Sequence, residues 1–395
     1  MPVAGYHFIK VSVYMNIVIA PDSFKGSLSA SEVADTIAMG ILGVHSDSII
    51  VQKPMADGGE GTTRAIVKAT GGDIFTSEVF GPLGASQLLN ACFGIIKMNN
   101  KKVAIVELAE AAGLAGVPQE KRNPLYTTTY GFGQLIVAAL DRSVDKLILA
   151  LGGSATNECG CGMIQALGAK FKDAFGDEIV GEMTAALLSQ VSSIDLSGFD
   201  QRLEKVEIEI CCDVNNILLG DAGASKVYGP QKGASSQIVM QLEQNMNTII
   251  NIIEKTTGKS VRHMRGSGAA GGTAAALLSF TNAVLMPGGA LVMQLCNLEH
   301  AIEQADIVIT GEGQLDTTSK MGKVVTPIAQ LANKYDKPVI VVVGQNKATE
   351  TEIAEMGITK VVTLVTDQVT VEQAQVDAAH YISALSGRDD FLTFE

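Results

Sequence analysis

Glycines and carboxylates stand together directly after short apolar runs in this chain. The clearest case is Gly311-Glu312-Gly313-Gln314-Leu315-Asp316, which follows the apolar run Asp306–Thr310. An apolar run bounded by such residues is typical of a buried parallel strand. Glycines allow a sharp turn and the close approach of a ligand. We therefore predict a strand-end turn in which Asp316, supported by Glu312, is an Mg²⁺ ligand or a carboxylate on the phosphate side of the site. The alternative is that Asp316 only caps the next helix.

The same arrangement follows two apolar runs near the N-terminus. Asn16–Ala20 is followed by a turn with a cation and a carboxylate, and Ile49–Lys53 by the sequence Asp-Gly-Gly-Glu-Gly. Taken alone, each could be a solvated turn or a helix cap. In open α/β sheets, however, ligands bind outside the carboxyl ends of the strands. We expect these turns to meet at one site for an anionic, phosphorylated ligand, with these candidates: Asp22, Ser23, Lys25, Asp57, Gly58, Gly59 and Glu60.

The turn richest in glycine follows the apolar run Lys146–Leu151 and occupies residues 152–162. Backbone N–H groups in such a turn, together with nearby hydroxyl and amide side chains, are suited to holding phosphates. The alternative is a tight crossover that packs only on itself. The predicted nucleotide ligands in this turn are Gly152, Gly153, Ser154 and Asn157.

Two further stretches are ambiguous. Asp213 ends the alternating strand Val206–Cys212, which suits a metal or ribose contact or an Asx turn. The stretch 266–271 has the letters of the dinucleotide fingerprint, but no strand leads into it. We expect a glycine-rich helix start there, in which Gly266 and Gly268 contact phosphate or allow close packing. Gly258-Lys259-Ser260 resembles the end of a P-loop and is predicted to be a helix C-terminal turn instead.

Composition narrows the function classes. A chain of 395 residues with 47% hydrophobic content indicates two domains with large cores. The net charge of −13 disfavours nucleic-acid or anionic-membrane surfaces, so an anionic ligand must be bound locally by helix N-termini, a few Lys or Arg, or cations.

The six cysteines form no Cys-x-x-Cys pair and are expected to be reduced thiols in a cytoplasmic protein. Cys159-x-Cys161 could bind metal, although small side chains in a crowded turn are the simpler interpretation. Residues 1–14 are interpreted as an extension.

Taken together, the turns resemble the bacterial glycerate 2-kinases. The motifs occur in family order between residue 15 and about residue 380. They are Ile-Val-Ile-Ala-Pro-Asp-Ser-Phe-Lys-Gly-Ser (17–27), Ala-Asp-Gly-Gly-Glu-Gly-Thr (56–62), Gly-Gly-Ser-Ala-Thr-Asn (152–157), Gly-Pro-Gln-Lys-Gly-Ala (229–234), Gly-Ala-Ala-Gly-Gly (268–272) and Ile-Thr-Gly-Glu-Gly-Gln-Leu-Asp (309–316). The departures from the family pattern include Glu158, Cys159 and Cys161, and none removes a carboxylate, Lys or Ser from a motif.

The resemblance implies ATP-dependent phosphorylation of D-glycerate to 2-phosphoglycerate with Mg²⁺, in a cleft between two α/β domains. One domain would be discontinuous and Rossmann- or flavodoxin-like, from residues 15–80 plus 290–395, with a second α/β domain, 81–289, inserted in it. The expected partners are small molecules, D-glycerate and ATP, with no nucleic acid and no membrane. A monomer and a homodimer are equally compatible with the sequence.

Residue chemistry suggests individual roles for this reaction. Lys25 would bind the glycerate carboxylate or the transferring phosphoryl group, and Asp57 would orient the 2-hydroxyl as a base. Asp213, Asp316 and Glu312 are the candidates for Mg²⁺, because hard cations take carboxylate oxygens. Two alternatives remain: a kinase for another small hydroxy acid, and a non-catalytic ligand sensor on the same fold.

Overall fold

The computed structural model describes residues 14–317, 319 and 324–394. The chain folds into two compact units. The first unit contains the described residues up to Pro54 together with those from Asn297 onward, and the second contains Met55–Cys296. The sequence placed these boundaries at 80/81 and 289/290. They differ because α2 (Thr62–Thr70) packs on strands β4 and β5 and on helix α9 of the second unit.

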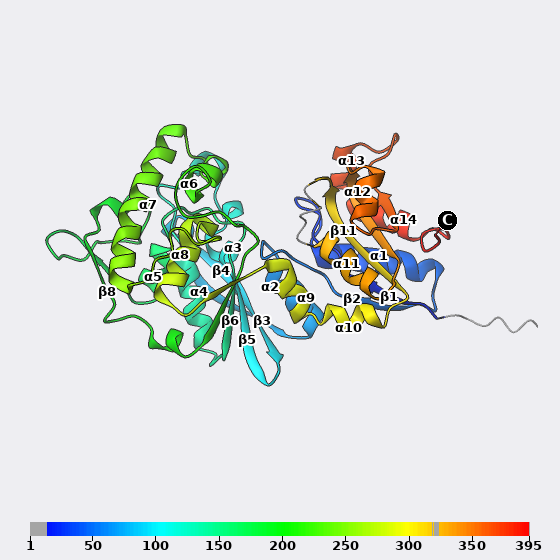
Figure 1. Cartoon of the computed structure of the whole chain (residues 1–395), viewed down its shortest axis with the longest axis horizontal. Coiled ribbons are helices and arrows are strands. Elements are labelled where there is room, and N and C mark those ends of the chain that lie inside the picture. Colours follow the sequence, from blue (N-terminus) through cyan, green and yellow to red (C-terminus); the bar gives the residue numbers. More distant parts are fainter. Residues whose placement is uncertain (1–13, 318, 320–323, 395) are drawn as a thin grey trace, which may run out of the picture. The chain divides into compact units, whose positions relative to one another are not determined.

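The first unit is built on five parallel strands in the order β13-β12-β11-β1-β2. This is the flavodoxin-like order, and the mixed α/β class predicted from the sequence is confirmed. Its strands are β1 (Asn16–Ile19), β2 (Ile49–Gln52), β11 (Ile307–Leu315), β12 (Val339–Asn346) and β13 (Lys360–Thr363). Its helices, seen on the right of Figure 1, are α1 (Ala30–Val44), α10 (Leu298–Glu303), α11 (Val325–Lys334), α12 (Glu350–Glu355), α13 (Val371–Val376) and α14 (Ala378–Ser386).

Helix α1 of the first unit begins with a local capping signal. Ser29 caps it, and the side chains of Ser29 and Glu32 form the complete capping box. Its apolar residues, Ile37 among them, share one hydrophobic core with Ile17 and Ile19 of β1 and with α13 and α14. This packing holds the residues that follow β1 at a defined place beside the sheet.

Strand β11 is longer than predicted. The Gly-Glu-Gly stretch is not a turn after the strand, because β11 stays paired with β12 as far as Leu315 opposite Asn346. Glycine makes this possible: a Cβ on Gly311 would overlap the Val342 carbonyl oxygen, and one on Gly344 would lie 2.5 Å from the Gly313 carbonyl oxygen. β1 pairs with β11 only up to Ile309, so Glu312 lies beyond the end of β1.

The second unit contains a mixed six-stranded sheet in the order β10-β9-β6-β5-β4-β3. The first four strands of this order are parallel, and β4 and β3 form an antiparallel hairpin where the sequence suggested a crossing between domains. The strands are β3 (Asp73–Gly81), β4 (Gly84–Met98), β5 (Lys101–Glu107), β6 (Lys146–Ala150), β9 (Glu207–Cys211) and β10 (Val284–Met286). A separate small hairpin joins β7 (Lys170–Lys172) and β8 (Ser193–Asp195).

Helices surround this second sheet, on the left of Figure 1. Helix α4 packs on β3, β4 and β5, and α7 packs on α8. Besides α2, the helices are α3 (Leu108–Ala112), α4 (Tyr130–Leu140), α5 (Cys161–Ala166), α6 (Ala224–Tyr228), α7 (Ser236–Thr257), α8 (Ala269–Phe280) and α9 (Gly288–Leu295).

The start of α8 is not the regular helix that the glycine-rich sequence suggested. Ala270, Gly271 and Gly272 all have positive φ and form a left-handed segment before the regular turns. The reason is close packing, since a Cβ on Gly271 would overlap the carbonyl oxygen of Thr156. This segment is therefore shaped by contact with the turn after β6.

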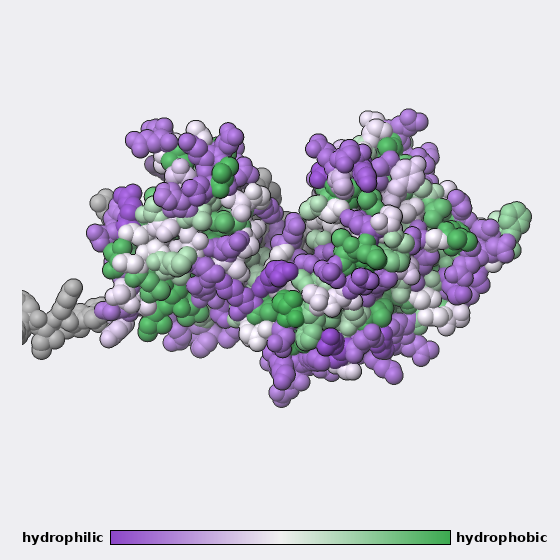
Figure 2. All heavy atoms as spheres, turned by 180° about the vertical axis from the view of Figure 1, so that it is seen from behind, coloured by the Kyte–Doolittle hydropathy of each residue, from purple (hydrophilic) through white to green (hydrophobic). Residues whose placement is uncertain are grey.

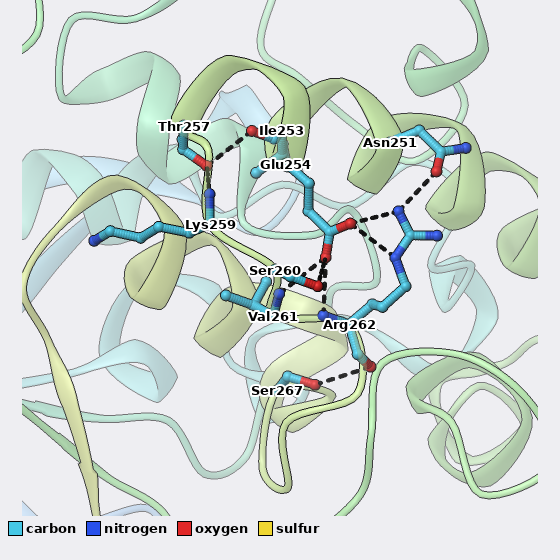
Figure 3. Close-up of polar contacts among 9 residues, drawn as sticks. All are labelled: Asn251, Ile253, Glu254, Thr257, Lys259, Ser260, Val261, Arg262 and Ser267. Atoms are coloured by element: carbon cyan, nitrogen blue, oxygen red, sulfur yellow. Dashed lines mark hydrogen bonds and ion pairs between the residues drawn. The ribbon is translucent and has the colours of Figure 1, made fainter.

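The loop before this segment is held by a polar cluster at the end of α7, shown in Figure 3. The Glu254 carboxylate accepts hydrogen bonds from the Val261 N–H at 2.9 Å and from the Arg262 guanidinium at 2.6 Å and 2.9 Å. Gly258 has φ +72° and caps α7, as predicted for this P-loop-like stretch. The cluster orients the chain that leads to Gly266.

The surface of both units is largely hydrophilic, with smaller apolar patches between the polar side chains on the face drawn in Figure 2. Within the described residues, no helix is long and apolar enough to cross a bilayer.

Gly271 and Gly258 have similar positive φ but different surroundings. Alanine substitutions at these two positions therefore distinguish the cost of backbone strain from the cost of a steric clash. Gly271→Ala should lower the free energy of unfolding by clearly more than Gly258→Ala. Both variants bear the cost of about 1–2 kcal/mol for a left-handed alanine. Only the Cβ at 271 meets backbone, whereas nothing lies within 4 Å of a Cβ at 258. Urea unfolding of the two variants provides the measurement, and equal losses would contradict this packing.

Candidate active site

Four parallel strands of the second unit end at one edge of its sheet. Glu107 ends β5, the glycine-rich turn follows β6, Asp213 follows β9, and Gly288 follows β10. Because parallel strands point the same way, their carboxyl ends place these residues along one edge. Within this unit, the turns that follow these four strands therefore share one edge of the sheet.

The Asp-Gly-Gly-Glu turn reaches the same edge through direct contact between backbones. The Gly152 N–H donates to the Gly58 carbonyl oxygen at 2.9 Å. A Cβ on Gly152 would lie 2.5 Å from the Cα of Gly59, and one on Gly58 would lie 2.9 Å from the Cys211 sulfur. These glycines are therefore needed for close packing, and the N–H of Gly152 is already occupied. Glu60, at the tip of the turn, is exposed.

Asp57 and Asp213 are brought to either side of Gly288. The Gly288 N–H donates to Asp213 Oδ1 at 2.7 Å, and a Cβ on Gly288 would overlap the Asp57 carbonyl oxygen and lie 3.0 Å from Asp213 Oδ2. The Asp57 carboxylate accepts the Gly59 N–H at 3.0 Å, which holds it in its own turn. The structure therefore brings the backbone of Asp57 and the carboxylate of Asp213 to the same glycine.

Glu107 fixes the end of this turn, a role that the sequence did not reveal. Its carboxylate is 1% exposed and accepts the Gly61 N–H at 2.9 Å and the Thr63 N–H. It therefore caps α2 from a distant strand. Burial raises the pKa of Glu107 to about 7, although the bonds from Thr63 and Gly61 act in the opposite direction.

The glycine-rich turn after β6 divides into an exposed part and a buried part. Gly153 is exposed and has φ +74°, and Ser154 lies beside it with 8% exposure. Asn157 is fully buried and donates to Ser225 Oγ at 3.0 Å, so it supports the turn from inside. Lys232, outside the predicted set, donates to Ser154 Oγ at 2.8 Å.

Gly266 and Gly268 lie next to the loop that carries Asp213. The Gly268 N–H donates to the Asn216 carbonyl oxygen at 3.0 Å, and a Cβ on Gly266 would lie 3.3 Å from the Val214 carbonyl oxygen. Both glycines are buried, which favours the close-packing alternative over direct phosphate contact.

The first unit gathers the other predicted residues around the end of β11. The Asp22 N–H donates to the Gly311 carbonyl oxygen at 2.8 Å, and the Ser23 N–H donates to Asp22 Oδ1 at 2.7 Å. Burial raises the pKa of Glu312 to about 7, and Asp22 and Asp316 raise it further while Ser319 and Lys25 lower it. Lys25 is exposed, and its backbone lies 3.7 Å from where a Gly313 Cβ would be.

Neither unit contains a ready-made metal cage among the described residues, since no group of three or more His, Cys, Asp or Glu is placed to hold an ion. Cys159 and Cys161 are buried thiols whose pKa burial raises, as expected for packing residues. Magnesium in kinases needs only one or two carboxylates besides phosphate oxygens. Glu312 fits this requirement, because its Oε1 is buried and has no hydrogen-bond partner in the described part of the chain.

Comparisons with known proteins indicate the family of this chain. The model of the glycerate kinase family matches residues 17–388. A protein named glycerate kinase from Bacillus subtilis is 44% identical over 93% of this chain and 95% of its own length. The chain belongs to the glycerate kinase family.

Two further relatives of this glycerate kinase family member extend the comparison. A protein named glycerate 2-kinase from Escherichia coli is 44% identical over 91% of this chain and 93% of its own length. A crystal structure from Salmonella typhimurium LT2, assigned provisionally as glycerate kinase 2, superposes with a TM-score of 0.81 at 41% identity. That match covers 95% of this chain and 96% of the other.

The raised pKa of Glu107 predicts how the free energy of unfolding of this glycerate kinase family member depends on pH. Its folded pKa of about 7 lies above the ordinary value of 4.5. The stabilisation that protonated Glu107 gives to the folded state is therefore fully present below about pH 4.5. It is lost as the pH rises through about 7. Relative to Glu107→Gln, the wild-type free energy of unfolding should fall by up to about 3 kcal/mol between about pH 4.5 and about pH 8.

Urea unfolding across this pH range measures the difference. Glu78→Gln, at an exposed position of β3, serves as the matched control and should follow the wild-type profile. Parallel profiles for wild type and Glu107→Gln would show that Glu107 does not titrate in this window.

Proposed function

We propose that this protein phosphorylates D-glycerate at its 2-hydroxyl, with ATP as phosphoryl donor, to give 2-phosphoglycerate. Phosphorylation of glycerate itself is supported by the family and by relatives of 44% identity named for it. The observation that carries the finer proposal is the contact of the Asp57 turn with the turn after β6, at Gly58 and Gly152. This contact supports the proposal because it joins the turn that carries Asp57 to a turn whose composition suits phosphate binding.

In the second unit, the proposed chemistry is hydroxyl orientation and phosphate binding. Asp57 accepts a hydrogen bond from the 2-hydroxyl of glycerate and then takes its proton. The hydroxyl oxygen forms a bond to the γ-phosphorus of ATP, the bond from that phosphorus to the β–γ bridging oxygen breaks, and ADP leaves. Gly153 and Ser154 donate hydrogen bonds to phosphate oxygens, because they are the accessible end of the turn and its adjoining hydroxyl.

In the first unit, the proposed roles are charge neutralisation and ion binding. Lys25 is an exposed cation among carboxylates and would bind the glycerate carboxylate or the transferring phosphoryl group. Asp22 and Ser23 lie in the same turn as Lys25 and are proposed to help bind the substrate. Glu312 and Asp316 here, and Asp213 in the second unit, are the proposed ligands of Mg²⁺, which when bound supplies positive charge to the phosphates.

The reaction itself is tested with ATP, Mg²⁺ and D-glycerate, with the products resolved by phosphorus NMR. The expected product is 2-phosphoglycerate with stoichiometric ADP. Formation of 3-phosphoglycerate would contradict the proposed position of attack. Turnover of tartronate or lactate but not of glycerate would instead favour a kinase for another hydroxy acid.

Asp57→Asn tests the proposed base. The amide cannot take the proton, so kcat should fall by about 100-fold or more while the KM for ATP changes little. Asp221→Asn is the control, because Asp221 is 99% exposed in its side chain and pairs with Lys226. Wild-type turnover in Asp57→Asn would remove Asp57 from the mechanism.

Magnesium titrations distinguish the proposed ion ligands. The measurement is the Mg²⁺ concentration that gives half-maximal rate at fixed ATP and D-glycerate. It is made for wild type and for three variants: Asp213→Asn, Glu312→Gln and Asp316→Asn. Loss of one carboxylate ligand should raise this concentration about tenfold. A variant whose titration overlays wild type does not carry a ligand, and full activity in excess EDTA would exclude the Mg²⁺ requirement.

A further inference from the structure

Lys232 is a buried cation directly behind the turn that follows β6. It ends the short helix Pro230–Lys232 and is 3% exposed. Its Nζ donates to Ser154 Oγ at 2.8 Å and to the Thr156 carbonyl oxygen at 2.7 Å. Both acceptors belong to the glycine-rich turn, so Lys232 is attached to this turn specifically.

No carboxylate of the described residues lies within 4.0 Å of this ammonium group, in contrast to Lys226 on the preceding helix α6, which pairs with Asp221 at 2.7 Å. Burying an ammonium group without an ion-pair partner is costly. Burial accordingly lowers the pKa of Lys232 to about 7, and only the charge of Glu158 acts in the opposite direction. The burial of this ammonium group is explained if a bound anion supplies the missing negative charge.

Two other charged residues near Lys232, Glu158 and Arg122, form hydrogen bonds of their own. The buried Glu158 carboxylate accepts the Thr129 N–H at 2.8 Å and the Thr129 hydroxyl. Arg122 lies against Gly233 through its backbone, and its Nε donates to the Val117 carbonyl oxygen at 3.3 Å. Neither group forms an ion pair with Lys232, so its charge remains available to the turn.

The contact with Ser154 has a consequence for its hydroxyl hydrogen. Since Ser154 Oγ accepts a hydrogen bond from Lys232, its own hydrogen must point elsewhere, and the hydroxyl becomes a donor. We propose that Lys232 is the positioning residue of the phosphate turn: it orients the Ser154 hydroxyl toward a nucleotide phosphate and places the compensating positive charge behind it. This inference rests on the proposed function, because it takes ATP as the ligand of the turn.

Binding of ATP should therefore be coupled to protonation of Lys232. The bound phosphates favour the charged ammonium and raise its pKa above the value in the free protein. Above about pH 7, Lys232 must take up a proton as ATP binds, so ATP affinity weakens as the pH rises from about 7 to about 9. A residue that only fills space would produce no such coupling.

The experiment is isothermal titration of wild type and Lys232→Met with Mg·ATP at several pH values, in buffers of different ionisation enthalpy. Wild type should take up protons on binding near pH 8. Lys232→Met should bind Mg·ATP at least about tenfold more weakly than wild type at about pH 7. The variant should lack the proton uptake seen in wild type, and its ATP affinity should depend less on pH. Lys226→Met, which removes a surface lysine, should match wild type.

A double-mutant cycle tests whether Lys232 acts through Ser154. The losses in ATP affinity for Lys232→Met and Ser154→Ala should be clearly less than additive, because each variant removes the same oriented hydroxyl. Urea unfolding of each variant verifies that it is folded, and Ser154→Ala removes the hydroxyl while Lys232 keeps its hydrogen bond to the Thr156 carbonyl oxygen. Additive losses, or unchanged proton uptake in Lys232→Met, would overturn the inference.

Failure of the inference and failure of the proposed function give different results. Wild-type protein that binds ATP and phosphorylates glycerate, beside a Lys232→Met variant with the same ATP affinity and pH profile, would overturn the inference alone. Wild-type protein that binds no ATP would overturn the proposed function and this role of Lys232 with it.

Discussion

The approach of two backbones at Gly58 and Gly152 is the constraint on which the proposed active site depends. Their hydrogen bond of 2.9 Å leaves no room for a side chain on Gly152. Through this contact the turn that carries Asp57 is held against the ends of β6 and β9. A methyl group at this point would separate a proposed base from the proposed phosphate turn, so the local glycine content serves placement as much as ligand access.

Buried charge is the second common feature of the second unit's site. Glu107 and Lys232 each cost free energy to bury, and each directs its hydrogen bonds to a loop backbone or to a side chain of the proposed site. The two groups act in opposite ways. Glu107 satisfies N–H donors at the start of α2. Lys232 donates two hydrogen bonds to the turn after β6. Both fix the conformation of a glycine-rich segment through hydrogen bonds.

The first unit obtains a comparable arrangement from a strand instead of a turn. Because β11 continues past the end of β1, Glu312 is held in a paired strand and lies near Asp22, Asp316 and Lys25. A carboxylate fixed by strand pairing loses little further freedom when an ion binds. Its raised pKa follows from burial beside other acids, and a cation would lower it again.

The sequence alone determined the local features of this protein. Residue types predicted several strand-end turns and the Gly258 cap, because these depend on neighbours within a few positions. The motif order further indicated the glycerate kinase family. Only the tertiary structure could decide that β11 continues through Gly311, and that Gly268 packs against backbone. It also revealed Glu107 and Lys232, whose hydrogen bonds span 46 and 78 residues. The physical reason is that burial, pKa and the space around a glycine are set by residues distant in the chain.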